Sequence, residues 1–170
     1  IHEDELMHPA MLVVPGGGYR LVSPSEAHLV ATEFYQAGYN VFVLEYTVNP
    51  LDEAPLKLQP LKDISRAMRM IRFRAEQLHV LSDRIVVCGF SAGGHLAATA
   101  GTHFKTKTQR PAFMLLAYPV VTMDKNVTHG GSRNNLLGKN PSEEMVKLYS
   151  NELQVTKKTP PTFLVHAKDD

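Results

Sequence analysis

The pentapeptide Gly89-Phe90-Ser91-Ala92-Gly93 has the pattern Gly-x-Ser-x-Gly. It lies between an apolar run at residues 85–88, typical of a buried strand, and a run of small residues at 92–101 that predicts a helix. A serine on such a sharp strand-to-helix turn stands clear of the sheet, and glycines two residues away on either side avoid collisions with neighbouring backbone. The pattern therefore predicts that Ser91 is a nucleophile.

Glycine-rich turns between a strand and a helix also occur in nucleotide-binding folds, where Ser91 would be one polar loop residue among others. The glycine spacing does not fit the dinucleotide fingerprint, and the chain has no Gly-Lys-Ser/Thr sequence of a phosphate-binding loop. The pattern therefore favours a nucleophile over a phosphate site.

The rest of the chain alternates between strand-like and helix-like segments. Ser23, Pro24 and Glu26 are predicted to start a helix, as its N-cap, its first-turn proline and a capping-box glutamate. We expect strands at residues 11–14, 40–46, 85–88, 113–117 and 162–166, and helices at 23–38, 61–78, 92–101 and from Asn140 onward. This alternation predicts one α/β domain over residues 1–170, a mostly parallel sheet with helices on both faces. Ligands bind at the carboxyl ends of the strands in such sheets.

A second glycine-rich segment, Pro15-Gly16-Gly17-Gly18-Tyr19, follows the first expected strand. In a hydrolase of this architecture, backbone amides at this place and just after the nucleophile hold the oxyanion of the tetrahedral intermediate. The candidate donors are the amides of Gly17, Gly18 and Ala92. Removing one such donor typically costs about 2.7–4 kcal/mol of transition-state stabilisation.

Three segments together resemble a known family: residues 15–19, the stretch Glu45-Tyr46-Thr47-Val48-Asn49-Pro50, and Gly-Phe-Ser-Ala-Gly-Gly-His-Leu-Ala at 89–97. They are similar to α/β-hydrolase esterases related to acetyl-xylan esterases and hormone-sensitive-lipase-like carboxylesterases, over essentially the whole chain. The resemblance implies the α/β-hydrolase fold and a serine carboxylesterase that hydrolyses short-chain esters, such as acetyl groups on plant-wall carbohydrate. It implies no cofactor and no metal.

The catalytic acid and histidine of this fold follow the nucleophile in that order along the chain. Asp169 and Asp170 come after the last expected strand, and the family pattern favours Asp170 over Asp169 as the acid. None of the eight histidines follows them, and His95, one turn into the helix after Ser91, is expected to be a packing or surface group. The resemblance implies that a final strand, a histidine loop and a closing helix are absent from this sequence. Loss of a triad histidine removes about 10⁶ in turnover, so we expect the 170-residue chain to be nearly inactive.

Charge and composition argue against several partner classes. The net charge is +1, so no overall field draws the chain to nucleic acid or to an anionic membrane. Residues 1–10 lack the pattern of a signal peptide, and no apolar segment approaches the ~18 residues that span a bilayer. Cys88, the single cysteine, is expected to be a small buried hydrophobe. Arginines at 66, 69, 72 and 74 are interpreted as the solvated face of a helix.

Two other functions fit the same fold. A serine peptidase of the prolyl-oligopeptidase type shares the Gly-x-Ser-x-Gly turn. A non-catalytic binding protein on a hydrolase scaffold is the alternative from another class, because a fold does not dictate a function.

Overall fold

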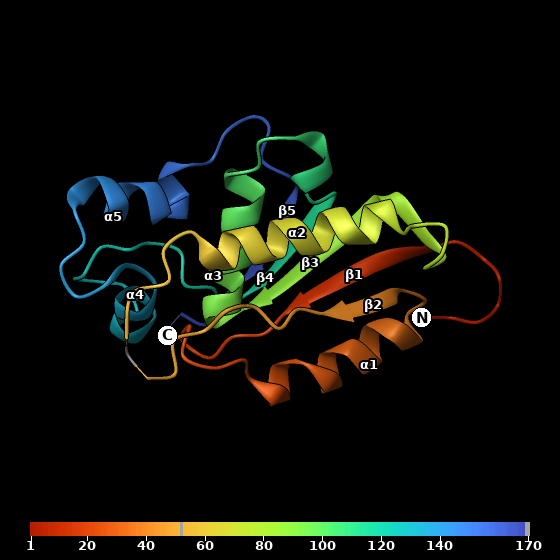
Figure 1. The fold of residues 1–170 in the computed structure, drawn as a ribbon, viewed down its shortest axis with the longest axis horizontal. Helices are drawn as coiled ribbons and strands as arrows, with labels where there is room; N and C mark the ends of the chain where they lie inside the picture. Colours follow the sequence, from red (N-terminus) through yellow and green to blue (C-terminus); the bar gives the residue numbers. More distant parts are fainter. Residues whose placement is uncertain (52, 169–170) are drawn as a thin grey trace.

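The computed structural model describes residues 1–51 and 53–168, and its centre is a five-stranded sheet (Figure 1). The strands lie in the order β2-β1-β3-β4-β5, and every neighbouring pair is parallel. Their bounds are β1 His8–Val14, β2 Asn40–Val43, β3 Val80–Phe90, β4 Phe113–Ala117 and β5 Thr162–Val165. The prediction of a mostly parallel sheet is confirmed.

Helices cover both faces of this sheet. Helix α1 packs on one face, and α2 and α3 lie on the other (Figure 1). The helices are α1 His28–Gln36, α2 Gln59–Phe73, α3 Ser91–Thr102, α4 Gly130–Leu137 and α5 Glu143–Tyr149, with 3₁₀ turns η1 Pro24–Glu26, η2 Lys107–Gln109 and η3 Asn151–Leu153. Because the strands are parallel, the carboxyl ends of β1, β3 and β4 all lie at the same edge of the sheet.

Strand β1 is buried on both faces, which explains why its sequence is continuously apolar rather than alternating. Met11 and Val13 pack with α1, while Leu12 and Val14 belong to the larger cluster with α2 and α3. Cys88 on β3 is buried in the smaller cluster, and burial raises the pKa of its thiol to about 12. The expectation of a small buried hydrophobe at this position is confirmed.

The start of the first helix differs from the prediction. Ser23 makes no side-chain cap, and its hydroxyl hydrogen-bonds Ser25 instead. The chain forms the short turn η1, changes direction at Ala27 (φ −98°, ψ −81°), and only then enters α1. The predicted capping box is wrong because the carboxylate of Glu26 is engaged elsewhere, by the backbone amide of Gly16 and the hydroxyl of Tyr118.

Helix α4 was not predicted, and α5 starts later than expected. Two glycines open α4, and its N-cap is His129, a residue type that is not among the preferred caps. Helix α5 is capped by Ser142, whose hydroxyl accepts from the Met145 amide, rather than by Asn140. Strand β3 is longer than expected and β2 shorter, as boundaries set by tertiary pairing often are.

The arginines of α2 divide into two groups. Three of them, at positions 66, 69 and 74, are exposed, as expected for a solvated face. Arg72 instead donates to the carbonyl oxygens of Ser82, Thr108 and Arg110, and so ties α2 to the start of β3 and to the η2 region, at the opposite edge of the sheet from Ser91. Among residues 1–51 and 53–168, no helix combines the length and the apolar character that crossing a bilayer requires.

Candidate active site

Ser91 occupies a strained turn between β3 and α3. Its φ is 50°, a region that side chains other than glycine rarely adopt. A Cβ atom on Gly89 would lie 2.5 Å from the Gly93 carbonyl oxygen, and one on Gly93 would overlap the carbonyl oxygens of Val14 and Pro15. Both glycines are therefore required by close backbone approach, and Ser91 is left partly exposed in a pocket of about 690 Å³.

The glycine loop after β1 lies directly against this turn. A Cβ atom on Gly16 would come within 2.9 Å of the Ser91 Cβ atom. Gly17 (φ 119°) and Gly18 (φ 64°) follow in backbone conformations that favour glycine. Within the described residues, neither of these two amides donates a hydrogen bond. Ala92 is buried in the first turn of α3, where backbone amides have no intrahelical acceptor. The structure thus places Ala92 in the Ser91 turn and the glycine loop, through Gly16, against that turn.

Glu26 bridges the two loops that flank the Ser91 turn. Its Oε2 atom accepts from the Gly16 amide at 2.6 Å, and its Oε1 atom accepts from the Tyr118 hydroxyl at 3.0 Å. Gly16 follows β1 and Tyr118 (φ 35°) follows β4, the two neighbours of β3. Burial, together with the hydrogen bond to Glu26, raises the pKa of Tyr118 to about 12. Glu26 and Tyr118 both line the pocket that contains Ser91.

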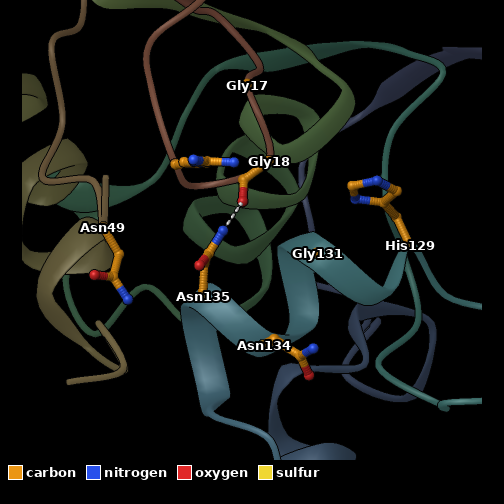
Figure 2. Close-up of a pocket in the computed structure, with 8 residues that line it drawn as sticks. Gly17, Gly18, Asn49, His129, Gly131, Asn134 and Asn135 are labelled. Atoms are coloured by element: carbon orange, nitrogen blue, oxygen red, sulfur yellow. Dashed lines mark hydrogen bonds between the residues drawn. The ribbon is translucent and has the colours of Figure 1, made fainter. Parts of the chain in front are cut away.

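Two further hydrogen bonds, from Tyr46 and from Asn135, hold the glycine loop in place. The Tyr46 hydroxyl donates to the Pro15 carbonyl oxygen at 2.8 Å. The side-chain amide of Asn135 on α4 donates to the Gly18 carbonyl oxygen at 2.9 Å, the dashed line in Figure 2. These two bonds hold the loop at both ends of the glycine run, through the carbonyl oxygens of Pro15 and Gly18.

His95 also supports the loop. It is fully buried, and its Nε2–H donates to the Tyr149 carbonyl oxygen at 2.8 Å, so that Nδ1 accepts from the Tyr19 hydroxyl at 2.8 Å. Burial lowers the pKa of this imidazole to about 4, and the ring is neutral. Of the two expectations for His95, packing group or surface group, the structure confirms the first.

The candidate acids Asp169 and Asp170 lie outside the described residues. The strand that precedes them, β5, pairs with β4 so that Val165 stands opposite Ala117, and it therefore ends at the same edge as Ser91. No hydrogen bond joins the Ser91 hydroxyl to a histidine within residues 1–51 and 53–168. The same residues contain no cluster of three or more His, Cys, Asp or Glu side chains that could hold a metal ion.

Sequence reasoning missed four residues of this site: Glu26, Tyr118, His129 and Asn135. Tyr118 could have been found, because it directly follows a parallel strand at the ligand-binding edge. Glu26 was interpreted as a helix cap, which is the more frequent role of a glutamate after Ser-Pro-Ser. His129 and Asn135 carry no local signal.

Known proteins with similar sequences and structures match nearly all of this chain. The protein-family profile described as BD-FAE matches residues 2–170. The chain is 39% identical to an endo-1,4-beta-xylanase B of Butyrivibrio fibrisolvens and 32% identical to an acetylxylan esterase of Xylanibacter ruminicola. These matches cover 100% and 95% of the chain, but only 28% and 33% of the two relatives.

A solved structure is similar to this chain in fold as well as in sequence. An acetyl ester-xyloside bifunctional hydrolase from Caldicellulosiruptor lactoaceticus superposes with a TM-score of 0.90 at 37% identity. The match covers all of this chain and 65% of that one. The chain thus spans about two thirds or less of the length of each of these proteins.

Proposed function

The chain belongs to the BD-FAE family and has the α/β-hydrolase fold, and on that premise we propose that it is a serine carboxylesterase of short-chain carbohydrate esters. Ser91 is the nucleophile, and the amides of Gly17, Gly18 and Ala92 form the oxyanion hole. One observation carries the proposal: the Ser91 turn lies against a glycine loop whose amides at positions 17 and 18 have no acceptor within the described residues.

The proposed reaction has two stages, acylation of Ser91 and hydrolysis of the acyl-serine. The Ser91 oxygen attacks the ester carbonyl carbon while its proton passes to a histidine, which the fold places after the acid, Asp170 or Asp169. The carbonyl oxygen becomes an oxyanion and accepts hydrogen bonds from the amides of Gly17, Gly18 and Ala92. The bond to the alcohol then breaks, the alcohol takes the proton, and water releases the carboxylic acid from the acyl-serine.

Two features support stabilisation of negative charge at this place. Helix α3 starts at Ser91, so its N-terminal amides and the positive end of its dipole face the developing oxyanion. The donors are also preorganised in the absence of substrate, because the Gly16 and Gly17 carbonyl oxygens, which share peptide planes with the Gly17 and Gly18 amides, already accept from the Ser23 and Arg20 amides. Preorganised donors need no reorganisation at the moment of reaction.

The substrate class comes from the relatives. One is named for acetylxylan and the hydrolase with the similar structure for acetyl esters and xylosides. We therefore propose acetyl groups on a xylose-based carbohydrate as the ester cleaved by this protein. The hydrogen-bonding side chains of Arg20, His129 and Asn134, which line a pocket beside the oxyanion loop, agree with an alcohol of this kind.

The experiment uses the full-length protein. We expect it to release acetate from acetylated xylan, to be labelled on Ser91 by a fluorophosphonate, and to lose both properties in Ser91→Ala. Cleavage of a proline-containing dipeptide amide instead would favour a peptidase. A folded protein that neither reacts with the probe nor releases acetate would refute the esterase.

A further inference from the structure

A second pocket, of about 570 Å³, opens beside the glycine loop (Figure 2). In Figure 2 the His129 ring lies on one side of Gly18 and Asn49 on the other, with two asparagines of α4 between them. His129 also lines the pocket that contains Ser91, so the two pockets adjoin. The lining includes Gly17, Gly18 and Arg20 from the loop, and His129, Asn134 and Asn135 from the α4 region.

Several polar groups of this lining are already used by the fold. Asn135 donates to the Gly18 carbonyl oxygen, and the Asn49 side-chain oxygen accepts from the Glu53 amide. The Nδ1 atom of His129 accepts from the Ser132 amide at 3.2 Å, which places the ring proton of the neutral imidazole on Nε2. These bonds hold the walls of the pocket in place.

Three other groups remain unused. The His129 Nε2–H, the Arg20 guanidinium and the Asn134 side-chain amide have no hydrogen-bond partner among residues 1–51 and 53–168. All three can donate, and the Asn134 oxygen can also accept. Among the described residues, the lining contains no carboxylate that would neutralise Arg20 and no large apolar side chain.

This chemistry selects among possible ligands. An alkyl or aryl group in the pocket would displace water from these donors and leave them unpaired. A sugar presents several hydroxyl oxygens at fixed spacing, each able to accept from a donor and to donate to the Asn134 oxygen. An acetyl group is too small to fill the pocket when its carbonyl oxygen lies at the Gly17 and Gly18 amides.

We infer that this pocket is the subsite for the alcohol half of the ester, a sugar whose hydroxyl oxygens accept from Arg20, His129 and Asn134. The inference rests on the proposed esterase, because the sugar is placed relative to an ester carbonyl held at the Gly17 and Gly18 amides. Arg20, His129 and Asn134 are then the side chains that distinguish a carbohydrate ester from a simple aryl ester.

The first test compares two substrates of the full-length protein. The ratio of kcat/KM for mono-acetylated xylotriose to kcat/KM for phenyl acetate is measured. We expect Arg20→Ala and Asn134→Ala each to lower this ratio about fivefold, mainly through KM for the sugar ester, since each removes hydrogen bonds that phenyl acetate cannot form. Lys139→Ala removes an exposed cation just beyond α4 that does not line the pocket, and should leave the ratio unchanged.

The second test measures binding without catalysis. Unacetylated xylotriose is titrated into Ser91→Ala protein and into the same protein carrying Arg20→Ala and Asn134→Ala, and backbone amide shifts are followed by NMR. We expect perturbation of Gly17, Gly18 and α4, and at least tenfold weaker binding in the variant with all three substitutions.

The outcomes separate the two proposals. Normal hydrolysis of phenyl acetate, with the substrate ratio and the xylotriose affinity unaltered by the Arg20 and Asn134 substitutions, overturns the subsite and leaves the esterase. Binding of xylotriose at this pocket by a protein that cleaves no ester overturns the esterase, and with it the assignment of the pocket to the alcohol half of an ester.

Discussion

The Glu26 Oε2 atom lies 2.6 Å from the backbone nitrogen of Gly16. This bond removes the Gly16 amide from the set of possible oxyanion donors and leaves those of Gly17 and Gly18. Through its other oxygen, Glu26 also holds the Tyr118 hydroxyl on the far side of the Ser91 turn. Glu26 therefore joins the loops after β1 and β4 across the end of β3.

Removing this carboxylate should slow the chemical step. We expect Glu26→Ala to lower kcat for an acetyl ester by about 10- to 100-fold with little change in KM, because a hydrogen bond to a charged group is worth about 1.5–3 kcal/mol and the freed loop misaligns its donors. Glu26→Gln should cost less than tenfold, since its amide can accept from Gly16 and donate to the Tyr118 oxygen. Steady-state kinetics of the full-length protein measures both effects.

Two variants serve as controls for Glu26. Glu33→Gln changes an exposed carboxylate on α1 and should have no effect. Tyr118→Phe added to Glu26→Ala should cause little further loss, because both remove the same hydrogen bond. If the losses of activation free energy in Glu26→Ala and Tyr118→Phe add in the double variant, the two side chains do not act through the same hydrogen bond.

The backbone conformation that presents the Ser91 hydroxyl should lower the stability of the folded protein. Its φ of 50° strains any side chain, so Ser91→Gly should unfold at a higher temperature than Ser91→Ala, by roughly 2–4 °C for a difference of about 1 kcal/mol. Both variants should be inactive, and calorimetry compares them. Equal melting temperatures would show that the turn is not strained.

The two glycines Gly93 and Gly130 should respond oppositely to alanine. A Cβ atom on Gly93 would overlap the Val14 and Pro15 carbonyl oxygens, and we expect Gly93→Ala to lower the free energy of unfolding by at least ~2 kcal/mol. A Cβ atom on Gly130 meets nothing within 4 Å, and Gly130→Ala should stabilise α4 slightly. Denaturant unfolding checks both, and a tolerated Gly93→Ala would mean that β1 and α3 are not in close contact.

The buried His95 should make stability depend on pH in the acidic range. Its pKa is about 4 in the folded protein and about 6.5 when unfolded, so the unfolded chain binds the extra proton between these values. The contribution of His95 is complete above pH 6.5 and decreases as the pH falls toward 4, by up to ~3 kcal/mol.

Unfolding free energies measured from pH 7 to pH 4 test this dependence, with His95→Gln as the comparison. The variant should be less stable at pH 7, because the hydrogen bonds to Tyr19 and Tyr149 are disturbed, but its stability should fall less steeply with acid. Parallel curves for the two proteins would assign the acid sensitivity to other groups.

Local patterns were sufficient for the main elements of the site. The Gly-x-Ser-x-Gly sequence and the glycine loop are short patterns that were both predicted from the residues alone, although the atoms that Gly16 and Gly93 approach belong to distant segments. Helix α4 was missed because its stability comes from packing of Leu136 and Leu137 rather than from helix propensity. The role of Glu26 was misassigned because its two partners are 10 and 92 residues away along the chain.

The amino-acid sequence by itself determined a parallel α/β sheet with a serine on a turn at one end of a central strand, since apolar periodicity and glycine spacing act over a few residues. The tertiary structure alone decided which loops adjoin that serine. Strand order brings β1 and β4 to either side of β3, so that Glu26 reaches Gly16 and Tyr118, and His95 is buried between Tyr19 and α5. These contacts depend on the packing of distant segments, which no local pattern encodes.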